Sequence, residues 1–209
     1  MHFFVLYCIE KCIFVKIKRD QAIKKYAMFI SESNLSLRIA EPEDGALIYR
    51  WENDRSVWRV SETSAPVSRF QIDQFLIANT DLTSSHQLRL MVEHQLCEKP
   101  VGCIDLFDYD PINSRIGIGV LIDEKYRGNG YAANAIHCCL EYLFNNLMVH
   151  QVFCLIDETN IESLHLFQKL GFHRGERRKD WIKTPDGYID ALFHQLINPK
   201  HDERSIERL

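Results

Sequence analysis

The segment of this sequence with the clearest chemical potential is a glycine-rich turn that joins a strand-like run to a helix-like run. It begins at Arg127 and contains Gly128 and Gly130. Glycines let the main chain approach an anion closely, and the first turn of a helix offers unpaired N–H groups at the positive end of its dipole. Arg127 would add charge-assisted hydrogen bonds. The pattern predicts a phosphate-binding loop, although a tight strand-to-helix connection explains the same glycines.

This turn matches neither the P-loop nor the dinucleotide-binding fingerprint. Together with a second motif downstream, it resembles the GNAT superfamily of N-acetyltransferases. The pyrophosphate loop of that family reads Gln or Arg, two residues, Gly, one residue, then Gly or Ala, and Arg127, Gly130 and Ala132 fill these positions. The stretch Asn160–Phe172 resembles the family's Asn, Ser, aromatic and Leu-Gly-Phe pattern. The resemblance covers about Leu35–Asn198 and is strongest to the branch of ribosomal-protein N-terminal, spermidine and antibiotic acetyltransferases.

The resemblance implies that acetyl-CoA is the acetyl donor. Two parallel strands, Gly117–Ile122 and Val149–Asp157, would splay apart and admit the pantetheine arm. The implied cofactor-binding residues are Val120, Leu121, Ile122, Arg127, Gly128, Asn129, Gly130, Tyr131, Ala132, Asn160, Ser163 and Phe167. Val120 and Ile122 would bind through backbone groups, whereas Asn160 and Ser163 are explained equally well as the N-terminal cap of a helix.

Acetyl transfer also needs a proton acceptor, because a lysine-like amine has a reference pKa of about 10.4 and is mostly protonated at neutral pH. In relatives a carboxylate often stands early on the strand before the loop, but residues 115–117 contain no acid here. If the preceding turn is symmetric about Asp110-Pro111, Asp105 lies across from Ile116 and becomes the candidate base. The alternative is that Asp105 is a buried structural carboxylate, paired with Arg115 or with a backbone donor.

Other acidic residues are candidates for the remaining roles. Glu93 is the second candidate base, while Glu52, Asp54 and Glu62 are expected to hold the charge of an amine substrate. Phe167 stands where many relatives carry a tyrosine that reprotonates the departing thiolate. The sequence therefore favours an enzyme that acetylates a primary amine (a polyamine, a protein N-terminus or a small molecule) by direct attack. The alternative is a catalytically weak acetyl-CoA sensor or interaction module.

The elements that must position these groups alternate between strands and helices. Strands are expected at Leu35–Ala40, Leu88–Glu93, Val101–Phe107, Arg115–Ile122, Val149–Ile156, Arg178–Lys183 and Tyr188–Ile197. Helices are expected after Glu41–Asp44, over Ser68–Asn79, after the glycine-rich turn, and from a capping box of Thr159 and Glu162 as far as Gly171. In the helix after the turn, one apolar stripe recurs at steps of three and four: Ala132, Ile136, Leu140, Leu143, Phe144 and Leu147. The result is an α+β domain with a central mixed β-sheet flanked by helices.

Composition narrows the class of protein. The chain has 209 residues, and 25 Lys and Arg against 29 Asp and Glu give a net charge of −4, so no general attraction to nucleic acid or to a membrane surface is expected. Seven cysteines, mostly in apolar runs, are typical of reduced thiols in the cytoplasm. No ligand spacing indicates a metal. The chain could act alone or as a homodimer.

The two ends differ from the central domain, 35–198. Residues 1–34 form an extension whose apolar run Phe3–Ile9 is too short to span a bilayer. It could be a membrane-surface or partner helix, but we favour an added strand or helix, or a gene start placed too early with Met28 as the initiator. Residues 199–209 are mostly polar and predict a frayed tail.

Overall fold

The computed structural model describes residues 29–30, 35–58, 65–78, 81–94 and 99–200. Most of the expected N-terminal extension lies outside the described residues, as do the candidate Glu62 and residues 201–209 of the expected tail. The two described residues of the extension, Phe29–Ile30, form a short strand that pairs with the strand at Leu35–Ile39. At least this part of the extension therefore joins the sheet.

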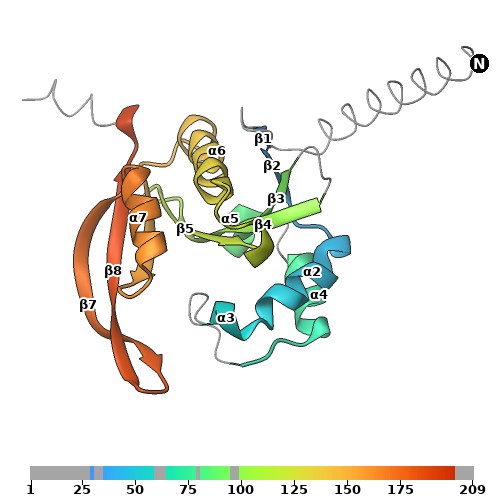
Figure 1. The fold of residues 1–209 in the computed structure, drawn as a ribbon. Helices are drawn as coiled ribbons and strands as arrows, with labels where there is room; N and C mark the ends of the chain where they lie inside the picture. The colour runs from blue at the N-terminus through green and yellow to red at the C-terminus, as the bar shows by residue number, and fades with distance from the viewer. Residues whose placement is uncertain (1–28, 31–34, 59–64, 79–80, 95–98, 201–209) are drawn as a thin grey trace, which may run out of the picture.

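A mixed sheet runs through the middle of the described chain (Figure 1). Its strands are β1 (Phe29–Ile30), β2 (Leu35–Ile39), β3 (Leu88–His94), β4 (Lys99–Asp110), β5 (Arg115–Ile122), β6 (Gln151–Asp157), β7 (His173–Thr184) and β8 (Gly187–Ile197). They lie in the order β1-β2-β3-β4-β5-β6-β8-β7. Among the strands that the structure describes, only β5 and β6 pair in parallel, which confirms the central mixed sheet.

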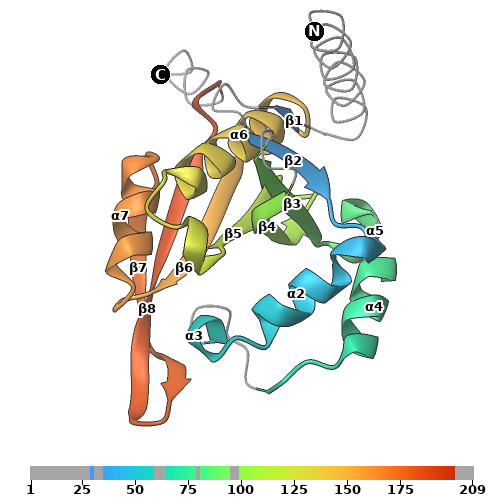
Figure 2. The same ribbon diagram turned by 45° about the vertical axis from the view of Figure 1, so that its right-hand side comes forward.

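Helices cover both faces of this sheet (Figure 2). They are η1 (Pro42–Asp44), α2 (Gly45–Glu52), α3 (Arg55–Trp58), α4 (Arg69–Ala78), α5 (Leu82–Ser85), η2 (Glu124–Tyr126), α6 (Tyr131–Asn145) and α7 (Ile161–Lys169). The larger hydrophobic core joins α6 and Phe167 of α7 to one face of the strands. A second core packs Ile48 and Trp51 of α2 and Leu76 of α4 against the other face.

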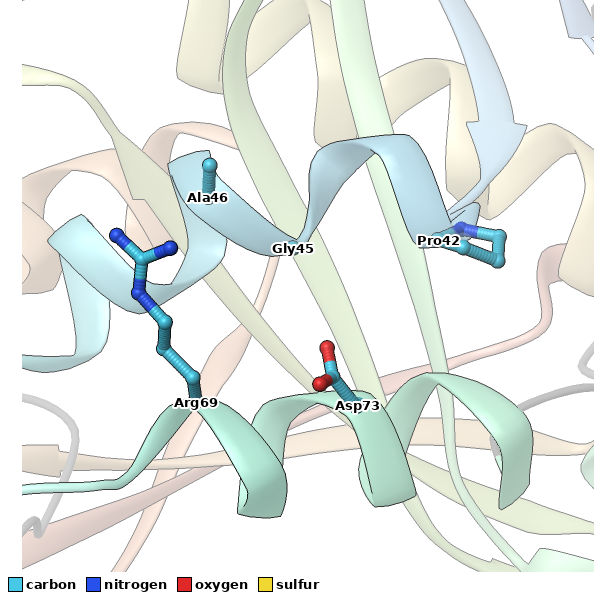
Figure 3. A pocket seen from close by; sticks show the side chains of 5 residues that line it. All are labelled: Pro42, Gly45, Ala46, Arg69 and Asp73. Atoms are coloured by element: carbon cyan, nitrogen blue, oxygen red, sulfur yellow. The ribbon is translucent and has the colours of Figure 1, made fainter.

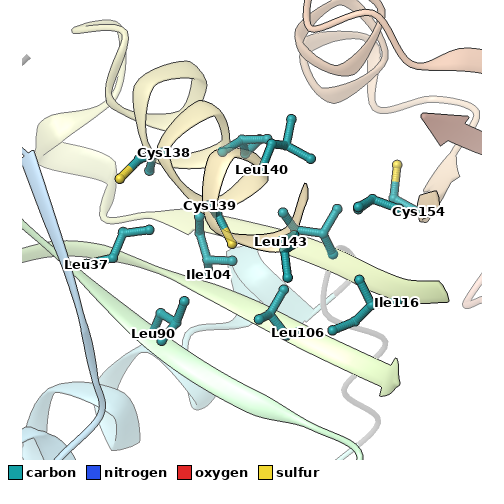
Figure 4. Close-up of a cluster of buried hydrophobic side chains, with 14 of the residues drawn as sticks. Leu37, Leu90, Ile104, Leu106, Ile116, Cys138, Cys139, Leu140, Leu143 and Cys154 are labelled. Atoms are coloured by element: carbon teal, nitrogen blue, oxygen red, sulfur yellow. The ribbon is translucent and has the colours of Figure 1, made fainter. Parts of the chain in front are cut away.

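The apolar stripe of α6 follows the predicted spacing. Ile136 and Leu143 are fully buried, and Leu140 is nearly so. Figure 4 shows Cys139 and Leu143 of α6 lying over Ile104 and Leu106 on the sheet. The stripe anchors α6, and with it the glycine-rich turn at its N-terminus, to the strand that precedes the turn.

The register between β4 and β5 differs from the prediction. Asp105 pairs with Gly119 rather than with Ile116, so the expected pairing is wrong. The prediction took the turn as symmetric about Asp110-Pro111, but the turn is centred further along the chain. Asp105 nevertheless remains beside β5, closer to the carboxyl end of that strand.

Hydrogen bonds to the Asp110 side chain explain why the turn lies further along the chain than predicted. The Asp110 carboxylate accepts hydrogen bonds from the backbone N–H and the side-chain amide of Asn113, at 2.9 and 2.7 Å, and Asp110 pairs with Arg115. Asp108 and Ser114 adopt positive φ angles of 49° and 53°, and the register shifts before Asp110. Symmetry about a Pro-containing dipeptide could not anticipate an Asx turn preceded by a bulge.

The start of α7 also differs from the prediction. Asn160, not Thr159, is the N-cap: its side-chain oxygen accepts the N–H of Ser163 at 3.1 Å. Thr159 instead donates its backbone N–H and its hydroxyl to Asp157. The capping box of Thr159 and Glu162 is therefore wrong, whereas the alternative interpretation of Asn160 as a cap is confirmed.

Candidate functional site

The parallel strands β5 and β6 separate after a short paired stretch. They pair only at Arg115, Ile116 and Gly117 of β5, and beyond Gly117 both strands continue without pairing to each other. The predicted splay is therefore present. Because β5 still pairs with β4 as far as Ile122, its other edge is left with unpaired backbone groups along the opening.

The orientation of these backbone groups follows from the hydrogen bonds at the end of β5. Asp123 donates its N–H to Val101 of β4 at 2.9 Å. Backbone groups of successive strand residues alternate between the two edges, so those of Val120 and Ile122 point away from β4 and towards the splay. The Ile122 carbonyl accepts Nε of Arg127 at 3.0 Å, as this orientation requires. The intervening Leu121 packs its side chain against the second core.

The glycine-rich turn combines an unusual backbone with open space. Gly128 and Gly130 have φ angles of +77° and +76°, a region that L side chains rarely adopt, and no atom lies within 4 Å of where a Cβ would stand at either residue. Asn129 fixes the turn by donating its side-chain amide to the carbonyls of Tyr126 and Arg127. The local sequence thus leaves an exposed stretch of main chain at 127–130.

The first turn of α6 supplies hydrogen-bond donors to this stretch. The first helical bond of α6 runs from the N–H of Asn134 to the carbonyl of Gly130 at 3.2 Å. The N–H groups of Tyr131, Ala132 and Ala133 precede it and have no acceptor within the helix. With the exposed guanidinium of Arg127, the turn has the donors and the positive potential that an anion requires.

Asp105 lies beside the splay and is bound by an arginine that sequence reasoning missed. Arg89, its cross-strand partner on β3, donates Nε and one terminal nitrogen to the two Asp105 oxygens at 2.6 and 2.9 Å. The other terminal nitrogen donates to Glu52 of α2 at 2.6 Å. Burial opposes the charge of Arg89, but the Asp105 and Glu52 carboxylates outweigh it and raise the pKa of the guanidinium. The expected partner, Arg115, instead pairs with Asp110 at 3.1 Å.

Of the other acidic candidates that the structure describes, Glu52 shares Arg89 with Asp105, whereas Glu93 and Asp54 do not join this group. Glu93 lies on β3, one strand further from the splay than Asp105, and accepts Nε of Arg38 at 2.8 Å. Asp54 is exposed after α2. The carboxylates of Glu93, Glu52 and Asp105 are therefore all engaged with arginines.

A further acidic residue, Asp123, ties α2 to the segment between β5 and the turn. It accepts the indole N–H of Trp51 at 3.1 Å and forms ion pairs with Arg50 and Lys125. Partial burial would raise its pKa, but the Trp51 hydrogen bond and the two cations outweigh burial, so the pKa lies below its ordinary value of 3.8. Trp51 itself is buried and belongs to the second core.

The candidate cofactor-binding residues at the start of α7 and within it make contacts that maintain the fold. Asn160 and Ser163 form the helix cap, which uses the side-chain oxygen of Asn160 and leaves its NH2 group as a donor. Phe167 is 3% exposed, and its ring packs edge-on against Phe172 with the centroids 5.0 Å apart. Phe167 is therefore part of the core beneath α7.

The cysteines described by the structure are buried and free: Cys103, Cys138, Cys139 and Cys154. Burial raises the pKa of each thiol, to about 11 for Cys138 and higher for the others. Because the thiolate is the nucleophile, none of these four is suited to forming an acyl-enzyme. This supports direct attack by an amine.

A pocket of about 150 Å³ lies away from the splay, between α2 and α4 (Figure 3). It is lined by Pro42, Gly45, Ala46, Arg69 and Asp73. Over the described ranges, no group of three or more His, Cys, Asp or Glu side chains is arranged to hold a metal ion. In the same part of the chain, no helix is long and apolar enough to cross a membrane.

Comparison with known proteins agrees with this geometry. Residues 34–173 match the family described as "Acetyltransferase (GNAT) domain". Spermidine N(1)-acetyltransferase of Escherichia coli K12 is 26% identical over 148 residues, which cover 68% of this chain and 74% of that protein. The enzyme of the same name from Vibrio cholerae is 23% identical over 173 residues, covering 83% of this chain and 98% of that one.

Solved structures give the same fold. A spermidine N-acetyltransferase from Vibrio cholerae, in complex with CoA and spermine, superposes with a TM-score of 0.74 at 21% identity and covers 81% of this chain and 99% of its own. A dodecameric structure of spermidine N-acetyltransferase from the same organism gives a TM-score of 0.69 at 22% identity, over 83% and 99% of the two chains.

Proposed function

The chain belongs to the GNAT acetyltransferase family and is an N-acetyltransferase with acetyl-CoA as acetyl donor; we propose that the splay and the glycine-rich turn are where it binds this donor. The observation that carries the proposal is their continuity. The unpaired edge of β5 leads directly into a turn with two positive-φ glycines and the free N–H groups of α6. A thioester arm and a pyrophosphate need these two kinds of surface, in this order.

Specific residues fit each part of the donor. The N–H groups of Tyr131 and Ala132, with the Arg127 guanidinium, would hold the pyrophosphate, and the bare glycines would let the anion approach the main chain. Backbone groups of Val120 and Ile122 and the NH2 group of Asn160 would hold the pantetheine arm. When bound, acetyl-CoA supplies an activated carbonyl for attack by an amine.

Asp105 is the carboxylate that we propose as the proton acceptor. Its Cβ lies 3.9 Å from where a side chain at Gly119 would begin, on the stretch of β5 that borders the splay. Arg89 occupies one lone pair on each carboxylate oxygen, and each oxygen retains another. The Asp105 side chain is 36% exposed, so it can exchange a proton with solvent. Glu93 lies further away and is the weaker candidate.

The reaction also needs a proton for the departing thiolate, and Phe167 has none to donate. We propose that a water molecule supplies it. A thiol has a reference pKa of about 8.5, which makes a thiolate a tolerable leaving group without a dedicated acid. The missing phenol at Phe167 leaves the splay and the glycine-rich turn intact as binding surfaces.

The proposal also covers the oligomeric state, the cellular compartment and the acceptor. The dodecameric relative supports a multimer, of which a homodimer is the smallest form. The four described cysteines are free thiols, which supports a reducing compartment such as the cytoplasm. We propose a primary amine as acceptor, with its charge held by the acidic residues Glu52, Asp54 and Glu62, and the relatives named spermidine N(1)-acetyltransferase make polyamines one class to include in the test.

The proposed function is tested by following CoA release with a thiol-reactive dye, using purified full-length protein, acetyl-CoA and a panel of amines. We expect turnover with at least one primary amine. Calorimetric titration of CoA accompanies the assay. Tight CoA binding without turnover across the panel would contradict the enzyme and favour the sensor.

A further inference from the structure

The carboxylates of Asp105 and Glu52 already hold a cation. Arg89 donates three hydrogen bonds of 2.6 to 2.9 Å, two to Asp105 and one to Glu52. Its side chain is only 13% exposed, and its guanidinium also lies 5.2 Å from the ring of Phe75 on α4. An internal guanidinium thus sits between the two acids that a second ammonium group of a substrate would otherwise use.

This ion pair adjoins the place where the acceptor must react. Arg89, Asp105 and Gly119 are paired neighbours on β3, β4 and β5. A side chain at Gly119 would begin 3.9 Å from both Asp105 and the ring of Phe107. Gly119 lies two residues beyond the last residue of β5 that pairs with β6. Asp105, Arg89 and Phe107 therefore lie close together on β3 and β4, next to the strand β5 that borders the splay.

Next to the ion pair the sheet carries an aromatic row, formed by Phe107, Phe153 and Phe193. The rings of Phe107 and Phe153 meet edge to face at 6.0 Å, and those of Phe153 and Phe193 stack at 5.8 Å. Phe107 and Phe153 alternate with buried core residues, so they project from the face opposite α6 and α7. All three rings are half-buried and offer an apolar surface beside the splay.

The far end of the aromatic row carries a second cation. The Arg178 guanidinium lies 5.9 Å from the ring of Phe193 and 4.7 Å from that of Trp181, which is 52% exposed. A long polycation placed along the row would meet Arg89 at one end and Arg178 at the other. Like charges in such a site disfavour binding.

We propose that Arg89 is a specificity-determining residue that restricts the acceptor to monoamines, with the apolar or aromatic body of the amine lying on the aromatic row. This inference rests on the proposed acetyl transfer. The two carboxylates and Arg89 leave one net negative charge, which suits one ammonium group. A polyamine brings further charges, and the groups at the two ends of the aromatic row, Arg89 and Arg178, are cations.

The test compares two acceptors, 2-phenylethylamine and spermidine, in wild type and in Arg89→Met. Wild type is expected to show the higher kcat/KM with 2-phenylethylamine. Arg89→Met frees Glu52 and Asp105 and should shift the ratio of kcat/KM towards spermidine by on the order of tenfold. The ratio is insensitive to the folded fraction of the sample. Arg89→Lys keeps the cation and should keep the wild-type preference.

A second variant avoids the buried arginine. Arg178→Gln changes an exposed side chain and should shift the ratio in the same direction, by a smaller factor. Arg174→Gln on the same strand is its control, because Arg174 pairs opposite His194 and faces away from the aromatic row. Preference for spermidine in wild type, or an unchanged ratio in both Arg89→Met and Arg178→Gln, would overturn the inference.

Amine binding gives a readout that does not depend on turnover. In the presence of CoA, spermidine should raise the melting temperature of Arg89→Met more than that of wild type. If no amine is acetylated but this shift appears, acetyl transfer fails and the charge assignment stands. If turnover occurs but neither the ratio nor the melting temperature responds, only the charge assignment fails.

Discussion

The cofactor side and the acceptor side of the splay are built in opposite ways. On the cofactor side, the proposed binding groups belong mostly to the main chain and follow one another along a single segment, from β5 through the glycine-rich turn into α6. On the acceptor side, they are side chains from separate strands and helices, held by ion pairs such as Arg89 with Glu52 and Asp105. The first surface depends on backbone conformation and the second on charge and shape.

The largest expected effect comes from breaking the backbone conformation of the cofactor side. Gly130→Val forces a β-branched residue to a φ of +76° and places its side chain where the anion would lie. Loss of about two charge-assisted hydrogen bonds should weaken CoA binding on the order of 10³-fold in calorimetric titration. Gly187→Val, at a φ of +136° in the β7–β8 turn, is the matched control and should leave affinity unchanged. Equal affinity in Gly130→Val and wild type would refute the pyrophosphate assignment.

The second-largest expected effect comes from removing the proposed base on the acceptor side. Asp105→Asn removes the proposed base and should lower kcat at neutral pH by about 10²-fold. The loss should shrink as the pH approaches the amine pKa, about 10.4, because a neutral amine needs no base. Asp110→Asn, the same change at the far end of β4, should have little effect on kcat. A loss in Asp105→Asn that is independent of pH would instead mean that Asp105 only maintains the structure.

Substitutions at two glycines of β5 test how tightly Phe107 is packed on the acceptor side. A Cβ at Gly117 would lie 2.3 Å from the ring of Phe107, whereas one at Gly119 would make ordinary contacts of 3.9 Å. Gly117→Ala should therefore displace Phe107 and lower the free energy of unfolding by about 1–3 kcal/mol, measured by urea denaturation. Gly119→Ala should change it by no more than about 0.5 kcal/mol. The reverse order would show that Phe107 is not held as described.

The smallest effect concerns the ion pairs that connect the two sides. The pKa of Asp123 is lowered in the folded protein, so its contribution to stability is complete above 3.8 and is lost as the pH falls through the folded-state pKa. Asp123→Asn should therefore reduce the drop in melting temperature between pH 6 and pH 3. Asp186→Asn, in the exposed β7–β8 turn, serves as the control. An unaltered acid response in Asp123→Asn would rule out this linkage.

The same contrast explains what the sequence could predict. The glycine-rich turn and α6 follow from residues close together in the chain, the splayed strands were implied by the family resemblance, and the structure contains all of them. Asp105 was correctly placed near β5, but its partner was not. Arg89 and Asp105 are 16 residues apart, and Arg89 and Glu52 are 37 apart, so their contact depends on strand register and helix packing.

Local sequence patterns could have predicted part of the acceptor side. Arg89 alternates with Leu88 and Leu90 on β3, which marks it as facing away from the main core. With the register of the β4–β5 turn set correctly, the face of Asp105 would have followed. The aromatic row joins strands that are distant in sequence, and no local pattern connects Phe107 with Phe153 or Phe193.

Hydrogen–deuterium exchange with and without CoA tests the central claim most directly. We predict that CoA slows exchange at the unpaired edge of β5, residues 118–122, and across the turn and first helical residues, 127–133. The pocket between α2 and α4 should show no change. Protection confined to that pocket, or none at β5 and the turn, would contradict the assignment of the splay as the acetyl-CoA site.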